Sequence, residues 1–179
     1  MTRGGDRGAA ARDDTPAIVS PGVASAVLVL NNAFATELSP LDAERLAVLL
    51  ARAFHARVVG EADAFLLAFD ERADYDSPNY LWFRERYPRF VYVDRVVVSP
   101  AARGRGHARR LYADLIGRAA SVGHHVVVCE INSDPPNPAS DALHAALGFT
   151  EVGRAVIHGG GKTVRYLARS IARTRQESP

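Results

Sequence analysis

The sequence lacks several features that would assign it to a particular class of protein. Its 179 residues include a single cysteine, Cys129, so the chain cannot form an internal disulfide, as expected in the reducing cytoplasm. It has no apolar run near the roughly 20 residues of a membrane span, which predicts no membrane partner. Its net charge of +2 is too small to indicate binding to nucleic acid. These absences predict an ordinary globular protein of the cytoplasm.

What the chain does contain is the composition of one folded domain. Hydrophobic residues make up 47% and charged residues 23% of the chain. A chain of this length can bury about two-thirds of its unfolded surface in a single core. Residues 1–22 are rich in Gly, Ala, Arg, Asp and Pro and lack the apolar stretch of a secretory signal, which predicts a disordered tail. We therefore expect one domain over 23–171 and a flexible C-terminus over 172–179.

Hydrophobic periodicity predicts alternating strands and helices. One helix is expected to begin at Ser39-Pro40, and the others to span 104–120 and 139–147. The predicted strands are 26–30, 57–59, 64–69, 90–98 and 125–131, with a final hairpin of 149–158 and 163–170. Within the polar, aromatic-rich stretch 70–89, residues 75–80 are expected to form a turn-rich loop. This order indicates a mixed α/β sheet with helices on both faces.

The segment that carries chemistry joins a strand to a helix through a glycine-rich turn. Gly104 and Gly106 let the backbone approach a ligand with no Cβ in the way. The helix that follows presents unpaired N–H groups and a partial positive charge at its start, which favour an anion such as phosphate. Arg103, Arg105 and Arg109 add positive charge at the same end. The turn therefore predicts a phosphate-binding site.

Two other phosphate-binding motifs fit the sequence less well. The dinucleotide fingerprint requires a third glycine at the position that Arg109 occupies. The Gly161-Lys162-Thr163 run mimics the end of a P-loop, but the first glycine of that motif would fall at Val156. Neither motif is predicted.

The glycine turn resembles the R/Q-x-x-G-x-G/A signature of the GNAT superfamily of N-acetyltransferases, with Arg103, Gly106 and Ala108 on its defining positions. The resemblance implies a mixed sheet with a splayed centre and acetyl-CoA as co-substrate. It also implies that backbone amides of 104–109 hold the diphosphate, and that the preceding strand pairs with the pantetheine arm. The predicted cofactor residues are Val96, Val97, Val98, Arg103, Gly104, Arg105, Gly106, His107, Ala108, Arg109 and Asn137.

A second segment is similar to the same family. The run from Asn137 to His144, followed by Gly148-Phe149, resembles the family segment N-x-x-A-x-x-L-Y…G-F. The resemblance implies that Asn137 contacts coenzyme A. His144 stands where most members carry a tyrosine that protonates the departing thiolate, and histidine, with an ordinary pKa near 6.5, can give the same proton. The alternative is a helix histidine with no catalytic role.

Glu130 is the candidate base. It lies in a run that resembles a segment of ribosomal-protein alanine acetyltransferases, where the glutamate is thought to accept a proton. Acetyl transfer needs a neutral amine, so some group has to take the ammonium proton, and burial in an apolar strand raises a carboxyl pKa. Asp94 is a second candidate. The alternatives are a structural ion pair with an arginine for Glu130 and a salt bridge to Arg95 for Asp94. Cys129, in the same strand, is expected to be a buried, unreactive thiol.

The acceptor site is predicted from an aromatic stretch. Half of the aromatic residues fall in 75–92. Tyr80, Trp82 and Tyr92, with Asp74 and Asp76 nearby, form a wall that suits a cationic amine. The alternative is that these rings complete the core. We expect a small-molecule or peptide amine as acceptor and no metal; a homodimer is common in the family.

These motifs together predict an enzyme that moves an acetyl group from acetyl-CoA to a primary amine by direct attack. The alternative is a non-catalytic coenzyme A-binding or interaction module on the same fold, because a fold does not guarantee chemistry. A third hypothesis, an RNA-binding protein that uses the arginine cluster, predicts strongly salt-dependent binding.

Overall fold

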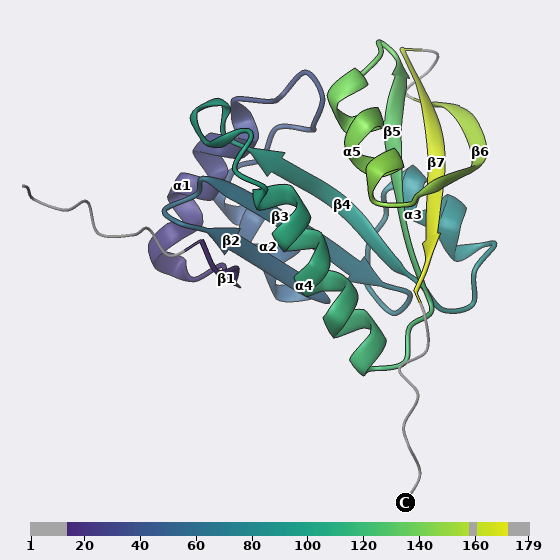
Figure 1. Cartoon of the computed structure of the whole chain (residues 1–179), viewed down its shortest axis with the longest axis horizontal. Helices are drawn as coiled ribbons and strands as arrows, with labels where there is room; N and C mark the ends of the chain where they lie inside the picture. Colours follow the sequence, from purple (N-terminus) through teal and green to yellow (C-terminus); the bar gives the residue numbers. More distant parts are fainter. Residues whose placement is uncertain (1–13, 158–160, 172–179) are drawn as a thin grey trace, which may run out of the picture.

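The computed structural model describes residues 14–157 and 161–171. These residues form one seven-stranded sheet in the order β1-β2-β3-β4-β5-β7-β6, with helices on both faces (Figure 1). The strands are β1 (Ala17–Ile18), β2 (His55–Val59), β3 (Ala64–Asp70), β4 (Val91–Val98), β5 (Val126–Asp134), β6 (Thr150–Ile157) and β7 (Lys162–Ser170). The helices are α1 (Pro21–Asn32), α2 (Ala43–Arg52), α3 (Pro78–Arg84), α4 (His107–Ser121) and α5 (Pro138–Ala146). The predicted mixed α/β architecture is confirmed.

The sheet parts at its centre. β4 and β5 pair in parallel, whereas the other neighbouring strands of the described chain pair antiparallel. The parallel ladder runs only from Val91–Val127 to Val93–Cys129. Beyond it, β4 stays paired with β3 as far as Val98 while β5 follows β7, and the two strands diverge (Figure 1). The splayed centre implied by the family resemblance is therefore present.

An extra residue lies in β4 at the point where the strands part. Leu67 and Ala68 are adjacent in β3, but their partners in β4 are Arg95 and Val93. Asp94 therefore has no partner residue in β3. It forms a β-bulge, which changes the direction of nearby side chains and interrupts the regular pairing. The bulge places the Asp94 and Arg95 side chains beside the opening between β4 and β5.

Each face of the sheet is covered by its own helices. Leu111 and Leu115 of α4, with Leu143 of α5, pack on one face. Leu30 of α1, Leu49 of α2 and the aromatic rings of α3 pack in the clusters of the opposite face. Figure 1 shows α4 and α5 in front of the sheet and α2 and α3 behind it. No helix among the described residues is long and apolar enough to cross a membrane.

The N-terminal part of the fold differs from the sequence prediction. Residues 26–30, predicted as a strand, lie in α1, where the buried Val27, Leu30 and Asn31 follow a helical spacing. A short apolar run fits a buried strand and a helix face equally well, so the pattern alone predicts the wrong element. β1 and the start of α1 also lie within 1–22, where the sequence predicts only a tail.

Two helix starts also differ from the prediction. α2 begins at Ala43 and not at Ser39-Pro40, because the Asp42 side chain accepts a hydrogen bond of 2.7 Å from the backbone N–H of Arg45. α3 overlaps residues 75–80, where the sequence predicts a turn-rich loop. It begins at Pro78, and proline suits the first position of a helix. This short helix brings polar side chains to one wall of the site described below.

The packing of α3 against the final hairpin can be tested at a glycine. A Cβ atom on Gly153 would lie 2.6 Å from Cζ2 of Trp82, whose ring stacks on Tyr166 with centroids 4.0 Å apart. We expect Gly153→Ala to lower the free energy of unfolding by about 1–3 kcal/mol, because the indole has to leave this stack. Gly117→Ala, on the exposed face of α4 with no atom near its Cβ, is expected to raise it by about 0.5–1 kcal/mol. Urea denaturation measures both variants, and an unchanged Gly153→Ala protein would contradict the packing.

Candidate active site

The turn between β4 and α4 leaves backbone N–H groups free. β4 ends at Val98, a single 3-10 turn spans Pro100–Ala102, and α4 begins at His107. Gly104 and Gly106 have φ angles of +77° and +81°, a region that favours glycine. Gly106 is the N-cap of α4 and gives no side-chain hydrogen bond to the first amides of the helix. These amides are available to an anion.

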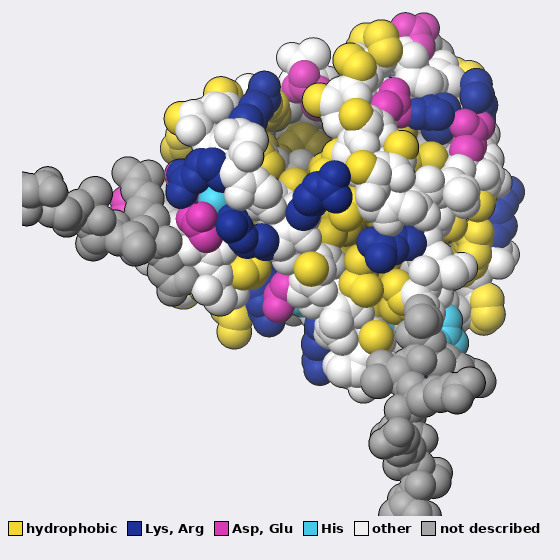
Figure 2. Space-filling model, viewed as in Figure 1, with side chains coloured by type: hydrophobic (Ala, Val, Ile, Leu, Met, Phe, Trp, Pro, Cys, Tyr) yellow, Lys and Arg dark blue, Asp and Glu magenta, His cyan; other side chains and the backbone are white. Residues whose placement is uncertain are grey.

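A cleft opens beside this turn. We name it the loop cleft; its volume is about 500 Å³, and Figure 2 shows it as a hollow with an apolar floor. Its walls come from the end of β4, the glycine turn, the start of α4, α5 and the α1–α2 connection. The predicted cofactor residues that line it are Val97, Val98, Arg103, Gly104, Gly106, His107, Ala108, Arg109 and Asn137. Val96 and Arg105 lie outside it.

Arg105 braces the turn from outside the loop cleft. Its guanidinium lies 3.0 Å from Asp14 and 3.3 Å from Asp63. Arg110 adds a second contact to Asp14 at 3.3 Å. The Arg105 side chain therefore pairs with carboxylates outside the loop cleft, so that only its backbone amide stays a predicted cofactor contact.

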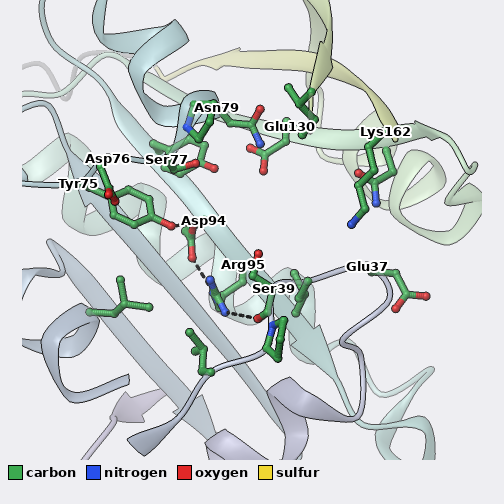
Figure 3. Close-up of a pocket in the computed structure, with 18 of the residues that line it drawn as sticks. Glu37, Ser39, Tyr75, Asp76, Ser77, Asn79, Asp94, Arg95, Glu130 and Lys162 are labelled. Carbon is green, nitrogen blue, oxygen red and sulfur yellow. Dashed lines mark hydrogen bonds and ion pairs between the residues drawn. The ribbon is translucent and has the colours of Figure 1, made fainter. Parts of the chain in front are cut away.

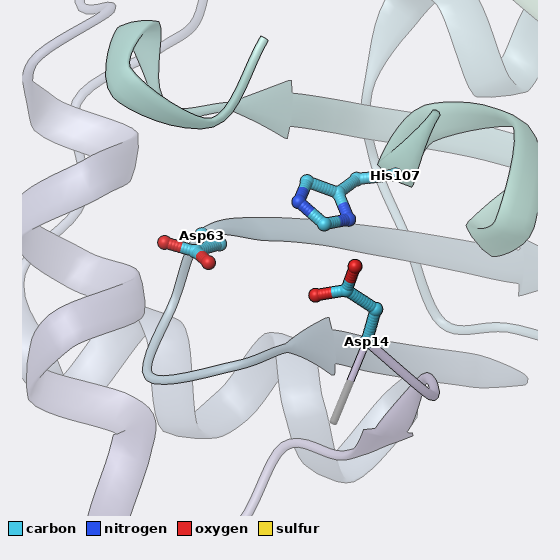
Figure 4. A group of neighbouring side chains, drawn as sticks. All are labelled: Asp14, Asp63 and His107. Atoms are coloured by element: carbon cyan, nitrogen blue, oxygen red, sulfur yellow. The ribbon is translucent and has the colours of Figure 1, made fainter. Parts of the chain in front are cut away.

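The same carboxylates form a group with His107 (Figure 4). The ligand atoms of Asp14, Asp63 and His107 lie within 4.8 Å of one another, a composition that could hold a metal ion. Arg105 and Arg110 already balance the two carboxylates, so the group has no excess negative charge to attract a cation. We interpret it as an ion-pair network that ties the N-terminal segment to the glycine turn.

A smaller cavity lies where β4 and β5 part. This splay cavity has a volume of about 90 Å³, and Val96 and Tyr112 are on its wall. It shares wall residues with both neighbouring hollows: Asn137 and Ser140 with the loop cleft, and Asp94, Arg95, Glu130 and Asn132 with the pocket described next. The three hollows are therefore contiguous.

The third hollow, which we name the polar pocket, continues from the splay cavity (Figure 3). Its volume is about 340 Å³, and its walls come from the α1–α2 connection, α2, α3, β4, β5 and β7. Its charged side chains are Glu37, Arg45, Asp76, Asp94, Arg95, Glu130 and Lys162. A wall of this kind suits a polar, charged ligand.

Asp94 is held firmly by its neighbours. The Tyr75 hydroxyl donates to one carboxylate oxygen at 2.5 Å, and Nε of Arg95 donates to the other at 2.5 Å. Arg95 also donates to Oδ1 of Asn31 at 2.7 Å. The Asp94 and Arg95 side chains are only 6% and 5% exposed. The salt bridge that the sequence left open as an alternative is thus present, and both oxygens of Asp94 are occupied.

Glu130, in contrast, keeps one oxygen free. Its Oε2 is buried and has no hydrogen-bond partner within the described part of the chain. Burial, and after it the charge of Asp94, raise the pKa of Glu130 from an ordinary 4.5 to about 7, although the side chains of Tyr92 and Asn79 offset part of the rise. A carboxyl group with such a pKa can exchange protons near neutral pH.

Tyr112 and His144 form a buried pair on the wall of the splay cavity. Nδ1 of His144 lies 2.7 Å from the carbonyl oxygen of Ser140, so this nitrogen carries the proton. Nε2 then accepts a hydrogen bond of 2.7 Å from the Tyr112 hydroxyl. Burial lowers the pKa of His144 and raises that of Tyr112, which keeps both side chains neutral. In this arrangement His144 gives its single N–H to Ser140, and Tyr112 gives its O–H to His144.

Cys129 lies beside this pair and is 2% exposed. Burial, and after it the nearby charge of Glu130, raise the pKa of its thiol well above the ordinary value. The predicted burial of this cysteine is confirmed, and the raised pKa is consistent with a thiol that keeps its proton.

The aromatic residues of 75–92 divide between pocket and core. Tyr92 lines the polar pocket. Tyr80 is fully buried, and its hydroxyl donates to the carbonyl oxygen of Asp70 at 2.8 Å. Trp82 stacks on Tyr166 and lines none of the three hollows. Tyr80 and Trp82 therefore complete the core, which corrects the prediction that they bind the acceptor.

Sequence reasoning also missed residues of the polar pocket. Tyr75 and Asn79 line it, and the Ser77-Pro78 helix start was a signal that could have placed Asn79. The acids expected to attract an amine, Asp74 and Asp76, are exposed and contact arginines of α2. Lys162 reaches the pocket because the β6–β7 hairpin folds beside β5.

The fold and the site define a domain with an anion-binding glycine turn that opens into a splayed sheet. The sequence pattern of the Acetyltransferase (GNAT) family matches residues 48–149, more than half of the chain. The chain therefore belongs to this family, and the prediction of the family is confirmed.

Known acetyltransferases are similar to this chain in sequence or in fold. An L-methionine sulfoximine/L-methionine sulfone acetyltransferase of Salmonella typhimurium is 44% identical over 62 residues, 35% of each chain. An L-2,4-diaminobutyric acid acetyltransferase of Nocardia farcinica is 41% identical over 66 residues, 37% of this chain and 33% of its own. The match thus spans about a third of these relatives. A phosphinothricin acetyltransferase of Sinorhizobium meliloti, solved in complex with acetyl-CoA, has the same fold, with a TM-score of 0.67, 19% identity and 93% of each chain covered.

The unusual pKa of Glu130 predicts a pH-dependent stability difference. Its pKa is about 7 in the folded chain against an ordinary 4.5, so folding favours the protonated carboxyl group, and this contribution is lost as the pH rises through 7. We expect Glu130→Gln to raise the free energy of unfolding at pH 8 by up to about 3 kcal/mol and to change it little near pH 5. Urea denaturation at both pH values measures this, with the exposed Glu61→Gln as control. An equal effect at both pH values would contradict the raised pKa.

Proposed function

We propose that this chain transfers the acetyl group of acetyl-CoA to the primary amine of a small molecule by direct attack. The observation that carries the proposal is the continuity of the loop cleft, the splay cavity and the polar pocket, with Glu130 where the last two meet. A cofactor anchored at the glycine turn places its thioester between β4 and β5. An amine in the polar pocket then reaches the thioester from the opposite end.

Backbone groups of β4 support the cofactor. From Val96 to Val98 the strand pairs with β3 on one edge, and its other edge has lost β5. The unpaired groups of this edge can bind the pantetheine arm as an added strand. An N–H near Val97 or Val98 then polarises the thioester carbonyl as negative charge develops on its oxygen. The amides of 104–109 bind the diphosphate, with the positive charge of Arg109 beside them.

Glu130 acts as the base. It takes a proton from the acceptor ammonium, directly or through a water molecule, and frees the nitrogen lone pair. That pair forms the C–N bond while the C–S bond breaks, and the sulfur leaves as a thiolate with the bonding electrons. Asp94, already paired with Arg95, contributes a fixed negative charge that helps to keep the pKa of Glu130 near neutral.

Tyr112 gives the proton that neutralises the thiolate. Its hydroxyl lies on the splay cavity, where the sulfur is expected, and its high pKa means that it holds its proton at neutral pH. Before the transfer this hydroxyl donates to Nε2 of His144, and it rotates from that nitrogen to the thiolate to give its proton. Tyr112 thus takes the role of acid that the sequence motif suggested for His144. Its hydroxyl group stands in for that of the family tyrosine, which His144 replaces.

The acceptor is proposed to be a small amine. The names of the two relatives specify amino acids and their analogues, and a pocket of about 340 Å³ has the size of a small-molecule site. A peptide amine as acceptor stays a prediction from the sequence, as do the cytoplasmic location, the homodimer and the absence of a metal.

Binding and turnover together test the proposal against a non-catalytic module. We expect calorimetric titration of acetyl-CoA to show one saturable site that Gly106→Glu abolishes, because a side chain at φ +81° is strained and its charge repels the diphosphate. Gly117→Glu makes the same charge change on the exposed face of α4 and serves as control. Thiol release with a panel of amines follows. No binding by the wild type would contradict the proposal, and binding without thiol release would favour the module.

The assignment of the acid is tested by a pair of substitutions. We expect Tyr112→Phe to lower kcat by about 100-fold with the affinity for acetyl-CoA unchanged, because only the proton donor is lost. His144→Ala should cost less, and the double variant should be no slower than Tyr112→Phe, because His144 acts through the hydroxyl. Melting temperatures report on folding. A His144→Ala enzyme slower than Tyr112→Phe would return the acid to His144.

A further inference from the structure

The charges of the polar pocket are only partly paired with one another. Asp94 pairs with Arg95 at 2.5 Å, and Arg45 pairs with Asp76 at 3.5 Å. The charged side chains of the wall that have no ion pair within the described residues are Glu37, Glu130 and Lys162. Two opposite charges on Glu130 and Lys162 therefore face a pocket that is large enough for a small molecule.

Lys162 is held in position without being neutralised. It is the only lysine of the chain and the first residue of β7. Its Nζ donates to the carbonyl oxygen of Thr36 at 3.0 Å, which ties the hairpin to the α1–α2 connection beside the pocket. This neutral partner uses one of three N–H donors and leaves the positive charge unbalanced. Figure 3 shows the Lys162 side chain directed into the pocket and the Glu37 carboxylate directed away from it.

We propose that the acceptor carries a carboxylate as well as its amine, and that Lys162 binds this carboxylate. The inference rests on the proposed function, in which the amine is directed to Glu130. β5 and β7 are neighbouring strands, so Glu130 and Lys162 reach the pocket from the same part of the sheet. A molecule with one cationic and one anionic group satisfies both.

The same arrangement disfavours other amines. A polyamine would bring a second positive charge toward Lys162, and like charges disfavour binding. A simple alkylamine would leave the ammonium of Lys162 without an anion in a partly enclosed pocket. Arg95 is less suited to this role than Lys162, because its charge is already paired with Asp94 at 2.5 Å and its side chain is 5% exposed.

Matched pairs of acceptors test the proposal on the intact enzyme. L-2,4-diaminobutyric acid and L-methionine sulfone are each compared with the amine that remains when the carboxylate is removed, and thiol release gives kcat and KM. We expect the wild type to favour the carboxylated member by at least about tenfold in kcat/KM, as for a charge-assisted hydrogen bond. Lys162→Met should remove most of this preference through KM of the carboxylated member, and Lys162→Arg should retain it.

Controls separate this subsite from a general effect. Arg154→Met removes a positive charge from exposed β6, outside the three hollows, and should leave the preference intact. Melting temperatures and turnover of the decarboxylated amines show whether Lys162→Met is folded. The carboxylate subsite alone would be overturned if Lys162→Met lowered kcat/KM equally for both members of a pair. A wild-type preference for the decarboxylated amine would overturn it too. Acetyl-CoA binding without thiol release from any amine would overturn the proposed function as well.

Discussion

The site depends on the early end of the ladder between β4 and β5. Both strands continue after Val93 and Cys129, but β4 follows β3 and β5 follows β7. Unpaired backbone groups inside a protein are costly, so an opening of this kind has to be filled or bordered by polar groups. The same opening exposes one edge of β4, joins the glycine turn to the polar pocket and brings Tyr112 and Glu130 to one cavity.

The opening is supported by a polar network anchored in the bulge of β4. Tyr75, Asp94, Arg95 and Asn31 form a continuous chain of contacts that links α1, β4 and the segment before α3. Arg95 pairs with Asp94, and both side chains are almost buried. The charge of Asp94 also raises the pKa of Glu130, so the network that supports the opening also adjusts the candidate base.

The sequence predicts the cofactor side of this protein better than the acceptor side, for a physical reason. Gly104 and Gly106 are needed for local backbone geometry, and such requirements are visible in a short run of sequence. The strands that carry Val97 and Glu130 are equally visible from their apolar runs. The errors arise where tertiary packing decides. The run 26–30 fits two elements, and only contacts with β2, β3 and α2 make it a helix face. Tyr80 and Trp82 are aromatic in either location, and only the burial of α3 against β7 places them in the core.

The polar pocket depends on packing even more strongly, because its walls come from segments far apart in the chain. Thr36 and Lys162 are separated by 126 residues, yet their hydrogen bond closes one side of the pocket. Substitutions in any one of these segments can change the acceptor without disturbing the glycine turn, which uses backbone amides that most side chains do not affect. Likewise, His144 departs from the family tyrosine, but Tyr112 on α4 places a hydroxyl group at the same cavity. What the fold holds constant is the opening between two diverging strands, where we propose that the thioester lies. The side chains around that point, including the acid, can come from different elements.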